Sequence, residues 1–235
     1  MEVADDQNEE VVFQQVQQVL DHGADINAPI FDLPLLPRAA RLGQIKVVKL
    51  LIARGADVDL CTVPGETPLF GASEEGHESI VMHLLDQNAN VHPKTVLGYT
   101  ALHRAAAFGS HQIVKMLLHK NADVNAVTRD GFSSLHNAAR RGNLEVVQLL
   151  VEAGANICCK TYEGDTPEHF AVRSIWGHRS FAGATGHLET GIYLGGAARG
   201  QRSLAFVMGL HERLGAQSRV PTLKQELVRM IIEAS

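Results

Sequence analysis

The chain has 235 residues, of which 45% are hydrophobic and 20% are charged, so it has enough apolar side chains for a sizeable core and too little charge for a disordered polymer. No apolar run approaches the roughly 18 residues of a membrane helix, and the N-terminus is acidic where a signal peptide would be basic. The three cysteines lack C-x-x-C spacing, which excludes a disulfide framework. We therefore expect a soluble protein of the cytoplasm or the nucleus; its net charge of −5 and its scattered basic residues argue against nucleic acid or a membrane as its partner.

The first 33 residues hold eight acidic side chains and no lysine or arginine. The spacing of their apolar residues predicts one amphipathic helix over 11–22, formed by Phe13, Val16, Val19 and Leu20. A polar segment precedes that helix. We interpret 1–33 as an acidic N-terminal cap with a partial repeat.

A period of 33 residues follows. Four motifs begin at this spacing: Thr67-Pro68-Leu69-Phe70, Thr100-Ala101-Leu102-His103, Ser133-Ser134-Leu135-His136 and Thr166-Pro167-Glu168-His169. A second series stays in phase with them: Gly55-Ala56-Asp57, Asn88-Ala89-Asn90, Asn121-Ala122-Asp123 and Gly154-Ala155-Asn156. Four glycines fall between the two series: Gly43, Gly76, Gly109 and Gly142. Such a register predicts stacked units, each of which is too small to fold alone.

Each unit is expected to contain two helices and a turn. In the unit that starts at Ser133, this serine can cap a short first helix, Gly142 ends that helix, and Gly154 ends a longer second one. Asp130-Gly131 predicts a turn that projects between units.

These signals place complete repeats at 34–66, 67–99, 100–132 and 133–165, followed by a degenerate repeat with a Gly-rich connection at 166–202 and C-terminal helices at 203–235. The first complete repeat opens atypically with Pro34-Leu35-Leu36-Pro37. In the degenerate one, Glu168 replaces a core leucine, and the second helix does not follow on schedule. The start of this second helix is matched by Gly186-His187-Leu188-Glu189, which comes 11 residues late. The glycines of 175–202, however, predict an irregular connection instead of a helix.

One copy of the repeat runs from Gly98-Tyr99-Thr100-Ala101-Leu102-His103-Arg104-Ala105-Ala106 to Asp123-Val124-Asn125. The pattern resembles the ankyrin-repeat family over residues 11–172. The resemblance implies an all-α solenoid of helix-turn-helix units with projecting β-turn or hairpin loops. It also implies a protein-protein interaction module that binds its partner on a concave face, with His103, His136 and His169 bridging adjacent turns by hydrogen bonds.

Positions that stacking does not require lie in the turns and at the exposed ends of the first helices. Aromatic residues and arginines at such positions favour binding hot spots. We therefore predict these protein-binding residues: Arg41, Glu74, Glu75, Tyr99, Phe108, Arg129, Phe132, Arg140, Arg141 and Tyr162. For Tyr99 and Phe132 the alternative is that the rings cover neighbouring turns.

Asn27 and Asn125 match the acceptor spacing of an asparaginyl hydroxylase that acts on ankyrin domains, and the resemblance makes them modification candidates. We find no nucleophile-elbow, zincin or phosphate-loop motif in a usable context, so we expect no enzyme, no cofactor and no metal. His178 and His187 are nine residues apart, form no metal-binding or catalytic pattern with carboxylate or thiolate partners, and are expected to be solvated. We expect a monomer.

Near the C-terminus, Thr222 and Gln225 form a capping box at the start of a predicted helix. Its apolar face would dock on the last repeat. Alternatively, residues 220–232 resemble the opening helix of an F-box or SOCS-box motif. That resemblance would imply a substrate-recognition adaptor that recruits ubiquitin-ligase subunits.

Overall fold

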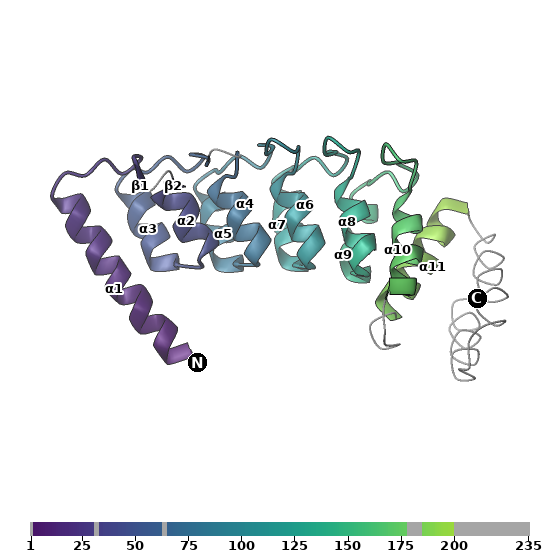
Figure 1. Ribbon diagram of the computed structural model, residues 1–235, viewed down its shortest axis with the longest axis horizontal. Helices are drawn as coiled ribbons and strands as arrows, with labels where there is room; N and C mark the ends of the chain where they lie inside the picture. Colours follow the sequence, from purple (N-terminus) through teal and green to yellow (C-terminus); the bar gives the residue numbers. More distant parts are fainter. Residues whose placement is uncertain (1, 31–32, 63–64, 178–184, 200–235) are drawn as a thin grey trace.

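Helices stacked side by side form an elongated array in the computed structural model, which describes residues 2–30, 33–62, 65–177 and 185–199 (Figure 1). After the long first helix α1 (Glu2–Asp21), β1 (Pro29–Ile30) and β2 (Leu33–Pro34) form a small antiparallel pair. The remaining helices come in pairs: α2 (Leu35–Arg41) with α3 (Ile45–Ala53), α4 (Pro68–Glu75) with α5 (Glu78–Asp86), α6 (Ala101–Phe108) with α7 (His111–His119), α8 (Ser134–Arg141) with α9 (Leu144–Glu152), and α10 (Pro167–Gly177) with α11 (Thr185–Arg199). The predicted all-α solenoid is confirmed.

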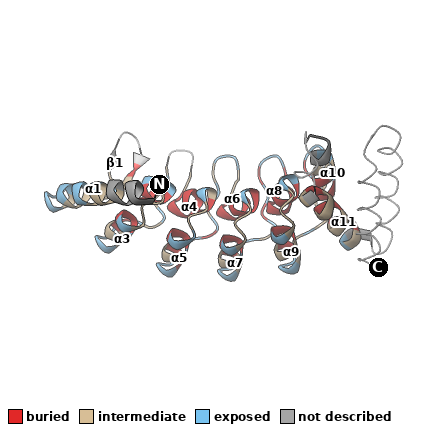
Figure 2. Cartoon of the chain, turned by 90° about the horizontal axis from the view of Figure 1, so that it is seen from below, coloured by how far each residue is buried: buried red, intermediate tan, exposed pale blue. Residues whose placement is uncertain are grey.

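The paired helices form two layers. The first helices α2, α4, α6, α8 and α10 pack on one another in sequence order, and the second helices α3, α5, α7 and α9 lie in a row beside them (Figure 2). Buried residues of both layers form one hydrophobic core that runs along the stack. We call the surface made by the loops and by the exposed sides and ends of the first helices the inner face.

Capping residues fix where each first helix begins and ends. The hydroxyl of Thr100 accepts a hydrogen bond from the backbone of His103, and Ser133 does the same for His136. Gly142 ends α8 with φ of 71°, a left-handed conformation that favours glycine. A Cβ at Gly142 would also lie 2.7 Å from the backbone nitrogen of His187, so both the backbone conformation and the lack of space require glycine here.

Leucine and alanine build the core. Leu69, Leu102 and Leu135, one from each central unit, are at most 1% exposed. The alanine pairs Ala105-Ala106 and Ala138-Ala139 are fully buried, and their small side chains let α6 and α8 approach closely. Each unit therefore buries its apolar residues only by contact with its neighbours.

Helix α1 extends beyond the expected range of 11–22, because the acidic segment before it is helical from Glu2 onward. The helix packs on α3 and reaches the start of that helix with its carboxylates. Glu9 Oε1 accepts a hydrogen bond of 2.8 Å from the backbone nitrogen of Lys46, and Glu10 lies 3.2 Å from the Lys46 ammonium. The acidic residues thus neutralise the N-terminus of α3. Val19 is 50% exposed and does not belong to the packed face.

The expectation of an irregular connection is wrong for 185–199, which form α11. His187 is buried, against the expectation that it is solvated, and its Nε2 lies 3.0 Å from the carbonyl oxygen of Arg140. His77 makes the same contact with Arg41 nearer the start of the stack, at 3.0 Å. The second helix of the last pair therefore begins late but docks in register. Packing on α8, α9 and α10 outweighs the helix-weakening effect of its glycines.

His178 and the C-terminal predictions, including the helices of 203–235 and the pattern at 220–232, lie outside the described residues. No helix of the described part is long and apolar enough to cross a membrane.

Candidate functional site

The loops of the inner face are closed by threonines. Thr95 donates from its backbone to the carbonyl of Tyr99 at 2.9 Å, and its hydroxyl accepts from the Tyr99 backbone at 3.1 Å. Thr128 makes the same two bonds with Phe132. Threonines occupy the equivalent position in all four loops, at 62, 95, 128 and 161, a periodic signal that the sequence motifs above do not include. This closure holds the intervening loop residues in a fixed, projecting conformation.

Histidines tie each first helix to the next loop, as the resemblance implied for His103 and His136. The His103 Nδ1 accepts from the Thr100 backbone at 3.2 Å, so Nε2 carries the proton and donates to the Phe132 carbonyl at 3.1 Å. His136 repeats this arrangement and donates to the Asp165 carbonyl at 3.2 Å. Burial lowers the pKa of His103 to about 4 and also lowers the pKa of His136. Both rings are therefore neutral near pH 7.

His169 differs from these two. Its Nδ1 accepts from the Thr166 backbone at 3.3 Å, but the ring is exposed and lies 3.5 Å from the Asp165 carboxylate. Within the described residues it makes no bond to a further loop. Its bridging role is thus not seen.

An ion network joins the first three first-layer helices. The Arg41 guanidinium donates to Glu66 at 2.9 Å and to Glu74, and lies 3.8 Å from Glu75. The other oxygen of Glu74 lies 3.3 Å from Arg104 Nε. Burial acts against the charge of Arg41, but the three carboxylates prevail and raise its pKa above the usual value. Glu74 is thereby held between two arginines from the helices on either side.

Arginines of the inner face stack on aromatic rings. The Arg104 guanidinium carbon lies 4.6 Å from the centre of the Tyr99 ring and 5.3 Å from that of Phe70. Arg140 lies 6.0 Å from Phe132, and Arg141 lies 5.7 Å from Phe108. A stacked guanidinium has lost part of its freedom before a partner arrives, which reduces the entropy cost of binding.

Arg104 is not among the binding residues that the sequence predicts. It directly follows His103, and the neighbouring units hold Gly71 and Asn137 at the same register position. A cation there, beside Phe70 and Tyr99 of the preceding unit, could have been recognised once the register was known.

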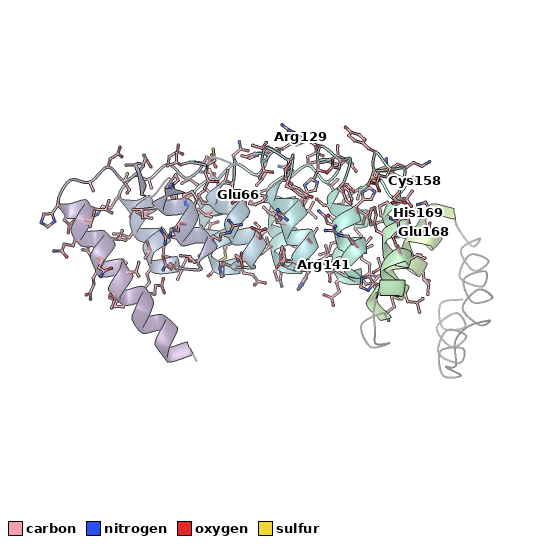
Figure 3. The ribbon with its side chains drawn as sticks, in the orientation of Figure 1. Glu66, Arg129, Arg141, Cys158, Glu168 and His169 are labelled. Atoms are coloured by element: carbon pink, nitrogen blue, oxygen red, sulfur yellow. The ribbon has the colours of Figure 1, made fainter. Side chains whose placement is uncertain are left out.

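The predicted binding residues do not form one cluster. Figure 3 shows Arg129 among the loops and Arg141 toward the opposite end of the helices. Tyr162 projects from its loop with 83% of its surface exposed, and Phe108 at the end of α6 is 53% exposed. The residues divide into a loop group and a helix-end group.

Tyr99 and Phe132 are only half-exposed. Tyr99 meets the His103 ring edge-on at 5.8 Å. Phe132 packs at 5.8 Å from His136 and at 5.1 Å from Phe170. Both rings therefore cover the turns beside them and offer a partner only part of their surface.

The side-chain amides of Asn27 and Asn125 connect neighbouring units. Asn27 Oδ1 accepts from the backbone of Asp57 at 3.0 Å. Asn125 Oδ1 accepts from the Asn156 backbone at 2.8 Å, and its amide nitrogen donates to the Gly154 carbonyl at 3.2 Å. An enzyme that hydroxylates either residue must first open these bonds.

The polar cluster nearest to a catalytic arrangement contains Cys159, whose sulfur lies 3.5 Å from Ser133 Oγ and 3.8 Å from His136 Nδ1. Burial raises the pKa of the Cys159 thiol, so the thiol stays protonated and is a poor nucleophile. No group of three His, Cys, Asp or Glu side chains suited to a metal ion occurs in the part of the chain described here.

Comparison with known proteins gives two matches to family models. The model described as ankyrin repeats (3 copies) matches residues 36–128. The model described as ankyrin repeats (many copies) matches 110–151 and 135–182. Together these matches cover more than half of the chain and all four regular helix pairs. A search of the curated proteins finds no match.

Proposed function

Because the chain belongs to the ankyrin-repeat family, whose members are interaction modules, we propose that it binds a partner protein non-catalytically through its inner face. The observation that carries the proposal is the set of arginines stacked on aromatic rings, which repeats across neighbouring units. Arginine and aromatic residues supply much of the binding energy of protein interfaces, and here they are held in place before binding.

The exposed sides of the second helices, which we call the outer face, lack this combination in the described residues. Its exposed cations, such as Lys49 on α3, Lys115 on α7 and Lys120 at the end of α7, are not stacked on aromatic rings. They therefore provide a control in which the same change of charge is made away from the proposed surface.

The test is affinity capture by three forms of the full chain: wild type, an inner-face variant and an outer-face control. The inner-face variant combines Arg129→Glu, Arg140→Glu and Arg141→Glu, and the control combines Lys49→Glu, Lys115→Glu and Lys120→Glu. Quantitative mass spectrometry should show proteins captured by wild type and by the control, but at least tenfold less by the inner-face variant. Equal capture by both variants, with unchanged melting temperatures, would contradict binding through the inner face.

The alternative function, a ubiquitin-ligase adaptor, depends on the capping box and the apolar face of 220–232. In that case, pull-down with the full chain would recover a ligase subunit of the kind that F-box or SOCS-box motifs bind. Deletion of 203–235 would abolish that recovery and leave the inner-face partner bound. If the ligase subunit is still recovered after the deletion, residues 203–235 do not recruit it, and the adaptor role is contradicted.

A further inference from the structure

One row of residues crosses the helix ends of four consecutive units. Each member directly precedes the left-handed glycine at the end of a first helix, at Gly43, Gly76, Gly109 and Gly142. The four residues are Leu42, Glu75, Phe108 and Arg141, and we call them the end row. Because the first helices pack in register, these residues follow one another along the same edge of the inner face.

The end row is exposed and alternates in chemistry. Leu42 is 58% exposed and Phe108 53%, and they are the large hydrophobic residues left exposed at first-helix ends in the part of the chain that the structure describes. The Glu75 side chain is 49% exposed and Arg141 is exposed as well. The order along the stack is therefore aliphatic, acidic, aromatic, basic.

Both charges of the end row retain capacity for a partner. Arg141 stacks on Phe108 and forms no ion pair with any described residue. Glu75 lies at the margin of the ion network, 3.8 Å from Arg41 Nε, whereas Glu66 and Glu74 bond directly to the Arg41 guanidinium. Glu74 is only partly exposed and is paired with an arginine on each side, so Glu75 is the most exposed carboxylate of this network.

The spacing of the row matches one kind of peptide backbone. Packed helices lie about 8–10 Å apart, which sets the step from one unit to the next. A polyproline II helix has three residues per turn and rises about 3.1 Å per residue, so every third side chain returns to the same face after about 9 Å. In a β-strand the side chains alternate with period two, so residues three positions apart point to opposite faces. Every second one of them would therefore point away from the end row.

From this spacing and charge order we infer that the end row binds a polyproline II segment of the partner protein. Its side chains at every third position would be apolar on Leu42, basic on Glu75, apolar on Phe108 and acidic on Arg141. The inference rests on the proposed function and specifies the partner's chemistry. Nucleic acid fits less well, because its phosphates would meet the carboxylates of Glu75 and Glu66, and the chain carries a net charge of −5.

The test uses a fluorescent peptide of sequence LPPKPPLPPE and its charge-exchanged counterpart LPPEPPLPPK, each made in both chain directions. Binding to the full chain is measured by fluorescence anisotropy. Two proteins are compared: wild type and the double variant Glu75→Lys/Arg141→Glu, which has the same net charge and changes only exposed positions. Melting temperatures confirm that both are folded.

Wild type should bind LPPKPPLPPE, in one chain direction, about tenfold more tightly than the counterpart, because the counterpart places a like charge opposite both Glu75 and Arg141. The double variant should prefer the counterpart by a similar factor. A non-specific cationic or anionic surface would not reverse its preference, because the net charge is unchanged.

Absence of binding by both peptides, a wild type without charge preference, or a preference that the double variant does not reverse would each overturn the inference. Tighter binding of a 12-nucleotide oligo-dT than of either peptide would do the same. If the inference fails while the inner-face variant still loses its captured proteins, the partner uses another part of the inner face and the proposed function stands. If both experiments fail, the proposed function falls too.

Discussion

Buried histidines link neighbouring loops at the scale of single residues. His103 is fully buried and accepts one hydrogen bond and donates another only in its neutral form. Protonation of Nδ1 would replace an acceptor by a second donor facing the Thr100 backbone. The same ring that joins two units therefore makes their junction sensitive to acid.

We predict that stability falls as the pH is lowered from about 6.5 to about 4. The pKa of His103 is lowered to about 4 in the fold and is about 6.5 in the unfolded chain, so the unfolded chain binds the proton more readily in this interval. The contribution of His103 is fully present above pH 6.5, and about 2 kcal/mol of it is lost at pH 5. Urea denaturation at pH 7.5 and pH 5 measures the change. His103→Gln should reduce this dependence, and an unchanged dependence would show that other groups cause it.

A second residue-scale prediction compares a stacking position with a surface position. Leu135 is fully buried between units, so Leu135→Asp should lower the free energy of unfolding by about 3–5 kcal/mol. Arg140 is exposed, and Arg140→Ala should change stability by less than about 1 kcal/mol while it weakens partner binding. Thermal melts of the two variants provide the measurement. Equal melting temperatures would mean that the assigned register is wrong.

Asparagine hydroxylation stays a prediction for Asn27 and Asn125. Treatment with an asparaginyl hydroxylase should add one oxygen atom, detected by intact mass and located by peptide mapping. Because Asn125 makes two bonds to the next unit, the reaction should be faster in the Leu135→Asp variant, which loosens that junction. A mass that remains unchanged in both proteins would remove both candidates.

At the scale of helices, α11 shows how packing can overcome poor local propensity. A Cβ at Gly186 would lie 2.6 Å from the Gly142 carbonyl oxygen, so the start of the helix needs a residue without a side chain. Gly191 is different, because a Cβ there would meet only Val172 and Ala171 side chains at 3.6 Å and 3.9 Å.

These two glycines form a matched pair for mutation. Gly186→Ala should destabilise the docking of α11, because the backbone of one of the two helices must shift. Gly191→Ala should be neutral or stabilise by up to about 1 kcal/mol, since alanine favours helices and an ordinary contact is available. Denaturation curves and hydrogen exchange of the α11 amides distinguish the two. A stabilising Gly186→Ala would show that the close approach to Gly142 is not needed.

The sequence was informative wherever a signal recurs at the period of 33. Thr100, Gly109 and Leu102 each have counterparts in neighbouring units, so the helix pairs, their ends and their buried faces could be predicted. The helical state of 185–199 could not, because the glycines argue against it locally and the stabilising contacts come from α8, α9 and α10. Arg104 was missed for a related reason, since its contacts with Phe70 and Glu74 lie in another unit.

At the scale of the whole molecule, contacts run between consecutive units and the two ends are unlike the middle. Helices α4, α6 and α8 are packed on both sides, whereas α1 lies on α3 at one end of the described array (Figure 1). In such a linear arrangement, local stability depends on the number of neighbours.

Hydrogen exchange should therefore vary along the stack. Amides of α6 and α8 should be the most protected, and those of α1 should exchange at least tenfold faster, because α1 can detach without opening a second junction. Mass spectrometry of peptides from exchanged protein measures this profile. Uniform protection from α1 to α8 would indicate that the stack opens as a single unit.

The joints between neighbouring units also give the array elasticity. Small rotations at the junctions between successive first helices, such as α6 and α8, add up along the row, so the molecule can bend without breaking any helix. A polyproline II segment bound along the end row would restrict rotation at the three junctions between these four units at once. Binding would then change the bending stiffness of the molecule, and tension applied to its ends would in turn alter the affinity for the segment.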